Sequence, residues 1–201
     1  MEKTKRLTTL ALLSALALGI YIAESQLPPL IPVQGVKPGL ANIITLTAMC
    51  LLGRREAGVV LAVRILLGSV FAGSVSALLF SAAGGALAYA AMCALVGLFP
   101  EKQLWVVSVF AALMHNLGQL LVAVWLTRTP QVLLYGFVLL CSGIVTGAFT
   151  GLCAGALIRA GRHWLRSAPP HRARDSAAID PAASGKRLPE REKLDGGEND
   201  T

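Results

Sequence analysis

The sequence has little charge, and the charge it has is unevenly placed. Charged residues make up 14% of the 201 residues, against about 25% in soluble domains. Between Leu7 and Ile158 the acidic residues are Glu24, Glu56 and Glu101. A soluble fold of roughly 150 residues cannot cover its surface with so few charges. The sequence therefore predicts that lipid covers most of the surface.

Aspartate is absent before Asp175, and this absence excludes one kind of catalytic site. Prenyl-diphosphate synthases hold magnesium with clustered aspartates, so this chain alone is not expected to catalyse that reaction. The sequence also has no Gly-x-x-x-x-Gly-Lys-Ser/Thr pattern, so we expect no ATP hydrolysis through a P-loop. The four cysteines lie inside apolar segments, and none is paired at metal-ligand spacing. We expect no metal, no other cofactor and no enzymatic activity.

The net charge of +7 does not indicate a nucleic-acid partner. The basic residues lie at the ends of apolar segments and near the C-terminus, and no basic face alternates with aromatic residues. We therefore expect no nucleic acid among the partners. Arg159, Arg162 and Arg166 are expected to lie against anionic lipid headgroups.

Six apolar stretches are candidates for membrane helices, each of which needs roughly 20 mostly apolar residues. They cover about residues 7–25, 38–53, 57–73, 75–98, 104–126 and 132–158. One set of their ends carries most of the basic residues, including Lys3, Arg54 and Lys102, whereas the opposite set carries only Lys37 and Arg128. Basic loops stay in the cytoplasm. The sequence therefore predicts an all-α integral membrane protein, a multi-pass six-transmembrane-helix bundle over residues 1–166 in the cell membrane, with cytoplasmic N- and C-termini.

Residues 167–201 have a different composition. They contain four prolines, charges of both signs and few apolar residues, without periodicity. Such a segment cannot bury enough apolar surface to offset the entropy lost on ordering. We predict a disordered cytoplasmic tail.

Residues 35–43, which read Gly-Val-Lys-Pro-Gly-Leu-Ala-Asn-Ile, place polar groups at the mouth of the second span. Pro38 suits the first turn of a helix, so the helix is predicted to start there. Lys37 and the free N–H groups of that turn could then hold an anion. The alternative is a lysine that reaches a lipid phosphate. Asn42, one turn deeper, either contacts a ligand or hydrogen-bonds a neighbouring helix.

Arg64 lies in the middle of the third span, where facing lipid would cost roughly 2.5–3.5 kcal/mol. It is therefore expected to face the bundle interior. Because Glu24 is the only acid on that side, Arg64 either pairs with carbonyls and amides or keeps a face for an anionic ligand. In the fifth span, His115, Asn116 and Gln119 lie on one side of the helix. This cluster indicates either a ligand site or a helix contact.

These motifs occur together in an order that resembles a bacterial family, the Gx transporter family. Its members are also labelled heptaprenyl diphosphate synthase component I. The resemblance covers about residues 7–160, and Pro38 departs from it, because an apolar residue such as leucine is expected there. The motifs are residues 35–43, Leu52-Gly53, Arg64-Ile65-Leu66-Leu67-Gly68, Gly84-Gly85 and His115-Asn116-x-x-Gln119.

The family is similar to the substrate-binding S components of energy-coupling factor (ECF) vitamin transporters. This resemblance implies a membrane subunit that binds a small anionic or vitamin-like solute under a gating loop, about residues 26–37. Ala11 and Ala15 would contact a transmembrane T component, and separate ATPase subunits would hydrolyse ATP. The alternative is a non-catalytic membrane accessory subunit of heptaprenyl diphosphate or quinone biosynthesis. The residues expected to bind the solute are Lys37, Asn42, Arg64, His115, Asn116 and Gln119.

Overall fold

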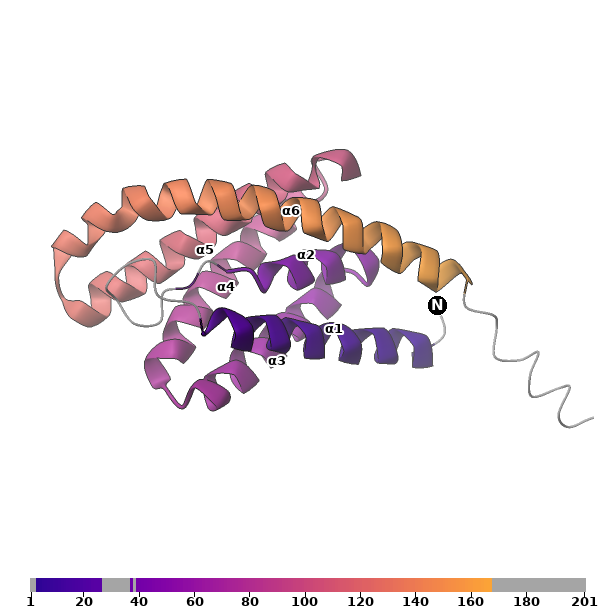
Figure 1. Ribbon diagram of the computed structural model, residues 1–201, viewed down its shortest axis with the longest axis horizontal. Helices are drawn as coiled ribbons and strands as arrows, with labels where there is room; N and C mark the ends of the chain where they lie inside the picture. The colour runs from indigo at the N-terminus through magenta and orange to yellow at the C-terminus, as the bar shows by residue number, and fades with distance from the viewer. Residues whose placement is uncertain (1–2, 27–36, 38, 168–201) are drawn as a thin grey trace, which may run out of the picture. The chain divides into compact units, whose positions relative to one another are not determined.

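All regular secondary structure in the described part of the chain is helical. The computed structural model describes residues 3–26, 37 and 39–167, with side chains as far as His163. Within these ranges there are six α-helices, two short 3-10 helices and no strand, so the all-α prediction is confirmed there (Figure 1). Most of the predicted tail lies outside the described residues. The helices are α1 (Lys3–Glu24), α2 (Asn42–Leu51), α3 (Arg54–Ala72), α4 (Val75–Leu95), η1 (Glu101–Gln103), α5 (Leu104–Thr127), η2 (Pro130–Tyr135) and α6 (Gly136–Ser167).

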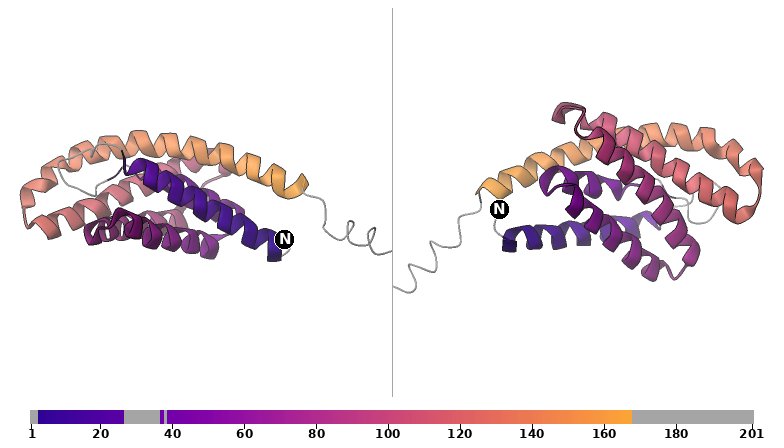
Figure 2. Two further views of the ribbon diagram at one scale, coloured as in Figure 1. Left: turned by 60° about the horizontal axis from the view of Figure 1, so that its bottom comes forward. Right: turned by 180° about the vertical axis from the view of Figure 1, so that it is seen from behind.

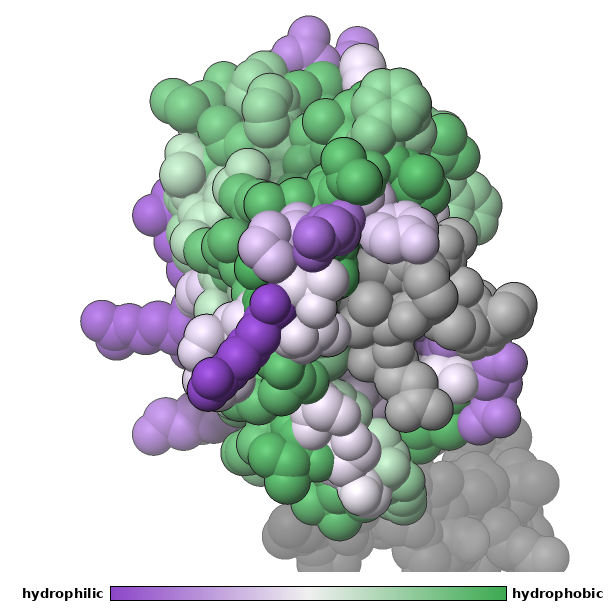
Figure 3. All heavy atoms as spheres, turned by 90° about the vertical axis from the view of Figure 1, so that its left-hand side faces the viewer, coloured by the Kyte–Doolittle hydropathy of each residue, from purple (hydrophilic) through white to green (hydrophobic). Residues whose placement is uncertain are grey.

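Four helical segments are long and apolar enough to cross a membrane. They are Lys3–Glu24, Val75–Leu95, Glu101–Thr127 and Pro130–His163. The 19-residue helix α3 is not among them, since it contains Arg54, Arg55, Glu56 and Arg64. Large apolar side chains such as Leu66, Val70 and Trp125 are exposed, and hydrophobic residues cover the upper part of the face seen in Figure 3. A surface of this kind would contact lipid.

Helix α2 is a short helix enclosed by the others. Its ten residues span about 15 Å, half of a hydrocarbon core of about 30 Å. Residues 42–49 are all buried. In Figure 1 and the right-hand view of Figure 2, α2 lies between α1 and α6, and one buried apolar cluster joins the three helices. Irregular backbone beside such a helix is allowed at membrane depth because protein covers it.

The predicted start of this helix at Pro38 is wrong. Pro38 itself lies outside the described residues, and α2 begins at Asn42. Gly39 has a φ of +79°, a left-handed value that an α-helix does not contain. Residues 39–41 therefore form a turn ahead of the helix. Its carbonyls accept from the first helical N–H groups, as in the 3.0 Å bond from Asn42 N to Gly39 O.

Glycines bring α5 very close to both of its neighbours. A Cβ added at Gly118 would lie 2.7 Å from the carbonyl oxygen of Ala83 on α4. On α6, a Cβ added at Gly151 would lie 2.4 Å from the Cα of Trp105. No larger residue fits at these positions without moving the helices apart, which agrees with the role of small residues in membrane-helix packing.

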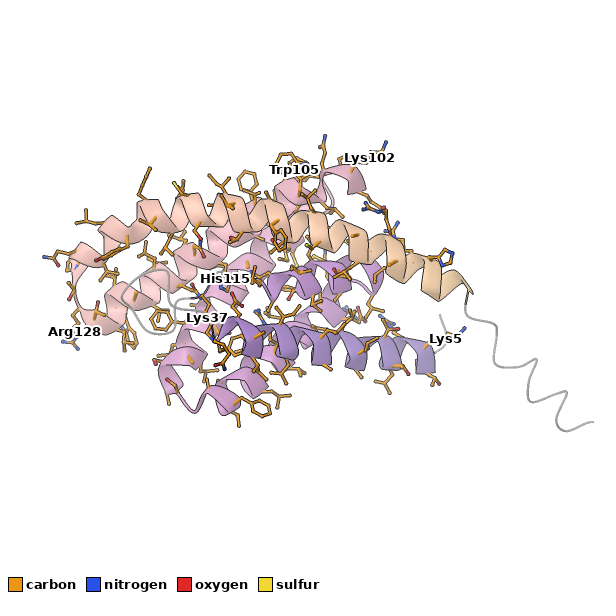
Figure 4. The ribbon with its side chains drawn as sticks, viewed as in Figure 1. Lys5, Lys37, Lys102, Trp105, His115 and Arg128 are labelled. Carbon is orange, nitrogen blue, oxygen red and sulfur yellow. The ribbon has the colours of Figure 1, made fainter. Side chains whose placement is uncertain are left out.

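Ion pairs join helices at the end of the bundle that carries most of the basic residues. Arg6 on α1 pairs with Glu56 on α3, and Arg162 on α6 pairs with Glu101. Lys5 and Lys102 lie toward this end in Figure 4, and Arg128 lies at the opposite end. The sequence predicted this uneven distribution of charge between the two ends.

Candidate functional site

A small cavity inside the bundle brings four of the predicted site residues together. They are Lys37, Arg64, His115 and Gln119, and Figure 4 shows Lys37 and His115 near each other in the middle of the molecule. The space open to the centre of a water-sized sphere is about 10 Å³, about what one water molecule needs. The described lining residues are Tyr21, Glu24, Lys37, Gly39, Arg64, Ala77, Ser81, His115 and Gln119.

Arg64 is the most deeply placed charge of this cavity. Its side chain is 1% exposed, and its Nε and Nη2 atoms have no hydrogen-bond partner among the described residues. The neighbouring position on α4 is Gly85, where a Cβ would lie 3.3 Å from Nη2. The prediction that Arg64 faces the bundle interior is confirmed. A buried guanidinium with unpaired N–H groups is costly unless something else binds it.

Glu24 occupies the position where the sequence predicted a bound anion. The carboxylate is buried and accepts hydrogen bonds from Gly39 N and, at 3.0 Å, from Leu40 N. The next N–H groups, of Asn42 and the following residues, donate to carbonyls of the turn. The protein's own carboxylate therefore satisfies the start of α2, and those N–H groups are not free for a ligand. The only hydrogen bonds found for Glu24 in the described part are these two, and no ion pair to Arg64 lies within 4 Å.

Lys37 points into the bundle. Its Nζ lies 3.8 Å from the centroid of the Tyr21 ring and donates to Ser25 Oγ. Its backbone N donates to Gln119 Oε1 at 3.1 Å. An ammonium over an aromatic face is attracted by the ring quadrupole. These contacts hold Lys37 at the cavity, which disfavours the alternative in which it reaches a lipid phosphate.

His115 is fixed between two glycines. A Cβ added at Gly39 would lie 2.9 Å from its Cδ2, and a Cβ added at Gly84 would lie 2.9 Å from its Nδ1. Nδ1 has no hydrogen-bond partner among the described residues. The ring is thus held by its surroundings on both sides, with a nitrogen left unpaired beside the cavity.

The two predicted asparagines do not line this cavity. Asn116 donates to Leu139 O on α6 at 2.7 Å, so its side chain joins α5 to α6. Asn42 is buried close to Gly39, and both polar atoms of its amide lack partners in the described part of the chain. The proposed role of both residues in ligand binding stays a prediction.

Tyr21, Glu24 and Ser81 line the cavity but were not among the residues predicted to bind the solute. Tyr21 and Glu24 are three residues apart on α1, and Tyr21 continues the buried positions Leu13 and Ala17 of that helix. A tyrosine and an acid on the buried face of an apolar helix form a detectable signal. The hydroxyl of Tyr21 is buried and has no partner among the described residues.

A second, larger cavity of about 410 Å³ adjoins the first. The two share Tyr21, Lys37 and Ala77 in their linings. The other walls of this outer cavity come from the ends of α1, α3 and α4, and among its described lining residues Lys37 is the only charged one. The remaining lining residues are Ile22, Ser25, Gln26, Gly68, Phe71, Ala72, Ser74 and Ser76.

The predicted partner contact on α1 lies away from these cavities. Ala11 and Ala15 are both exposed, and Gly19 one turn further has open space around it. Among the described residues, no three His, Cys, Asp or Glu side chains are grouped so that they could hold a metal ion.

The comparison with known families gives one match. The profile of the family described as heptaprenyl diphosphate synthase component I matches residues 13–157. No curated protein and no solved structure matches the chain. The matched range contains every cavity residue named above, and it confirms the family that the motifs predicted.

Proposed function

The chain belongs to the heptaprenyl diphosphate synthase component I family, and from this premise we propose that it is a membrane-embedded substrate-binding or transport subunit. Its solute is a small anion, and the subunit works in the manner of an ECF transporter S component. The proposed membrane domain is residues 1–166, with six spans and both termini in the cytoplasm, and the predicted tail after it lies almost wholly outside the described residues.

The observation that carries this proposal is Arg64. It is a cation buried inside the bundle whose Nε and Nη2 groups bond to none of the described residues. Ionisable groups inside membrane proteins mark ligand or ion pathways, because burying them without a role is costly. Lys37 adds a second cation at the same cavity. An anion bound there would pair with both.

The proposed cycle has three steps. The solute enters from the outer side near Lys37, the loop of residues 26–37 closes over it, and reorientation of the bundle by partner subunits releases it inward. The exposed ridge of Ala11 and Ala15 is the proposed contact for a T component, because small residues allow a close approach of helices. Separate ATPase subunits supply the energy.

Uptake by cells that express the chain tests this function. Arg64→Ala is expected to abolish accumulation of the solute, because it removes the buried positive charge. Arg55→Ala is the matched control, since Arg55 is exposed on the same helix. Unchanged uptake of every candidate solute by Arg64→Ala, together with a purified protein that carries no ligand, would refute the proposal.

The family description favours a second candidate function, a non-catalytic accessory subunit of heptaprenyl diphosphate or quinone synthesis. Under this alternative the chain would bind a synthase at the membrane. Co-purification with an active synthase whose product output depends on this chain would favour the accessory role. Co-purification with T-component and ATPase subunits would favour transport.

A further inference from the structure

We propose that the ligand is a small organic monoanion, with its anionic group in the inner cavity and its uncharged body in the outer one. This inference rests on the proposed function and specifies its substrate class. It assigns a role to Glu24 that the function alone does not: its carboxylate sets how many negative charges the site accepts.

The charges around the inner cavity leave one positive charge in excess. Lys37 and Arg64 are the basic residues of its described lining, and Glu24 is the acidic one. Glu24 is counted as ionised, because Oε1 accepts hydrogen bonds from two backbone N–H groups. His115 is counted as neutral, its usual form at pH 7. One bound negative charge brings the buried site to neutrality. A dianion would leave an uncompensated negative charge in a low-dielectric interior, which is unfavourable.

The hydrogen-bonding groups of the cavity point to an acceptor-rich group. Among the described residues, the hydroxyl of Tyr21 and the Nε and Nη2 groups of Arg64 are donors without a partner, and His115 Nδ1 is unpaired as well. Two acceptors are in use, since Glu24 Oε1 accepts from two backbone N–H groups and Gln119 Oε1 accepts from Lys37 N. A carboxylate offers two acceptor oxygens and matches guanidinium geometry.

The sizes of the two cavities indicate which part of the ligand each can hold. The inner space of about 10 Å³ holds little more than a water molecule, so an anionic group enters it by displacing side chains. The outer cavity of about 410 Å³ lies within the range of about 300–1,000 Å³ for small-molecule sites. Tyr21 and Lys37 line both spaces, so a ligand that moves them connects the two.

The lining of the outer cavity fits an uncharged body. Its walls combine apolar side chains such as Ile22 and Phe71 with the hydroxyls of Ser74 and Ser76. Among the described lining residues there is no carboxylate that could pair with a cationic group. A zwitterion would therefore find its positive end unpaired.

The substitution Glu24→Gln separates the charge of this residue from its structural contacts. An amide Oε1 can still accept from Gly39 N and Leu40 N, so the turn before α2 is retained. The excess positive charge rises from one to two. The site of the variant should therefore accept a dianion that the native site rejects.

Binding of three probes of similar shape to the full chain in lipid nanodiscs tests this inference: neutral benzamide, monoanionic benzoate and dianionic phthalate. The native chain is expected to bind benzoate at least tenfold more tightly than either of the others. In Glu24→Gln the ratio of phthalate to benzoate affinity should rise at least tenfold. Glu56→Gln is the control, because Glu56 pairs with Arg6 away from both cavities, and its ratio should stay unchanged.

The outcomes separate the two levels of the proposal. A native preference for phthalate, or a ratio unchanged in a folded Glu24→Gln, overturns the monoanion inference and leaves the anion-binding function standing. Absence of binding by both anions contradicts the proposed function as well. If Glu24→Gln fails to fold, the native preference among the three probes decides the inference alone.

Discussion

Gly84 on α4 lies against the imidazole of His115 on α5. A Cβ added at Gly84 would be 2.9 Å from Nδ1 and 3.0 Å from the backbone oxygen of His115. The side chain and the backbone of His115 therefore leave no room for a side chain at position 84. The crossing of α4 and α5 and the shape of the cavity are set at the same point.

Gly84→Ala is expected to destabilise the protein and weaken binding of benzoate. The added methyl group cannot be accommodated by a side-chain rotation alone, because backbone is also in contact, and overpacking of this kind costs about 1–3 kcal/mol. Chemical denaturation and probe affinity measure the two effects. Gly19→Ala is the control, because nothing lies within 4 Å of that position. It should be neutral or stabilising by up to about 1 kcal/mol. Equal behaviour of the two variants would contradict the proposed crossing.

Arg64→Met is expected to remove ligand binding without lowering the free energy of unfolding. Methionine, which has a similar length, removes the desolvation cost of a guanidinium whose Nε and Nη2 groups bond to none of the described residues. Lys37 stays beside Glu24 at the cavity, so the free energy of unfolding should not fall. Denaturation in detergent and probe binding check the two effects separately. A strongly destabilised Arg64→Met would show that Arg64 has a structural partner and is not reserved for a ligand.

Glu24→Ala is expected to be less stable than Glu24→Gln. Alanine leaves Gly39 N and Leu40 N without their acceptor, and an unsatisfied buried N–H group costs about 1–3 kcal/mol. Glutamine keeps an acceptor oxygen. Denaturation curves of the two variants give the difference. Equal stabilities would mean that the carboxylate does not hold the turn before α2.

Asn116→Ala is expected to lower stability by about 0.5–1.5 kcal/mol, since the hydrogen bond from its side chain to Leu139 O is lost. Its effect on benzoate affinity should be small, because the side chain faces α6. A tenfold loss of affinity in Asn116→Ala with unchanged stability would place Asn116 at the ligand instead.

Gln119→Ala should weaken binding, because Gln119 positions Lys37 at the cavity.

Composition and periodicity predicted the class of fold well. The scarcity of charge between Leu7 and Ile158 indicated a membrane protein. The apolar stretches located the helices to within a few residues, except around α2 and at the end of α6, which was expected near residue 158 and runs to Ser167. The insertion cost of Arg64 was sufficient to place it in the interior. These features are local, so each can be predicted from a single stretch of the sequence.

The start of α2 could not be predicted in the same way. Pro38 is a good first residue for a helix, but the carboxylate of Glu24 takes the N–H groups of Gly39 and Leu40 and delays the helix to Asn42. That contact joins residues 15 and 16 positions apart and has no signature in local propensity. The different positions of His115 and Asn116 could not be predicted either. These adjacent residues of α5 face different neighbours, since His115 lines the cavity and Asn116 contacts α6.

Native mass spectrometry of the chain purified from its own membrane, with native protein and Arg64→Met compared side by side, shows whether Arg64 holds a ligand. The native chain is expected to retain a small anionic molecule that the variant lacks. A native chain without any bound small molecule, or the same molecule bound equally to both proteins, would refute the role of Arg64 in anion binding.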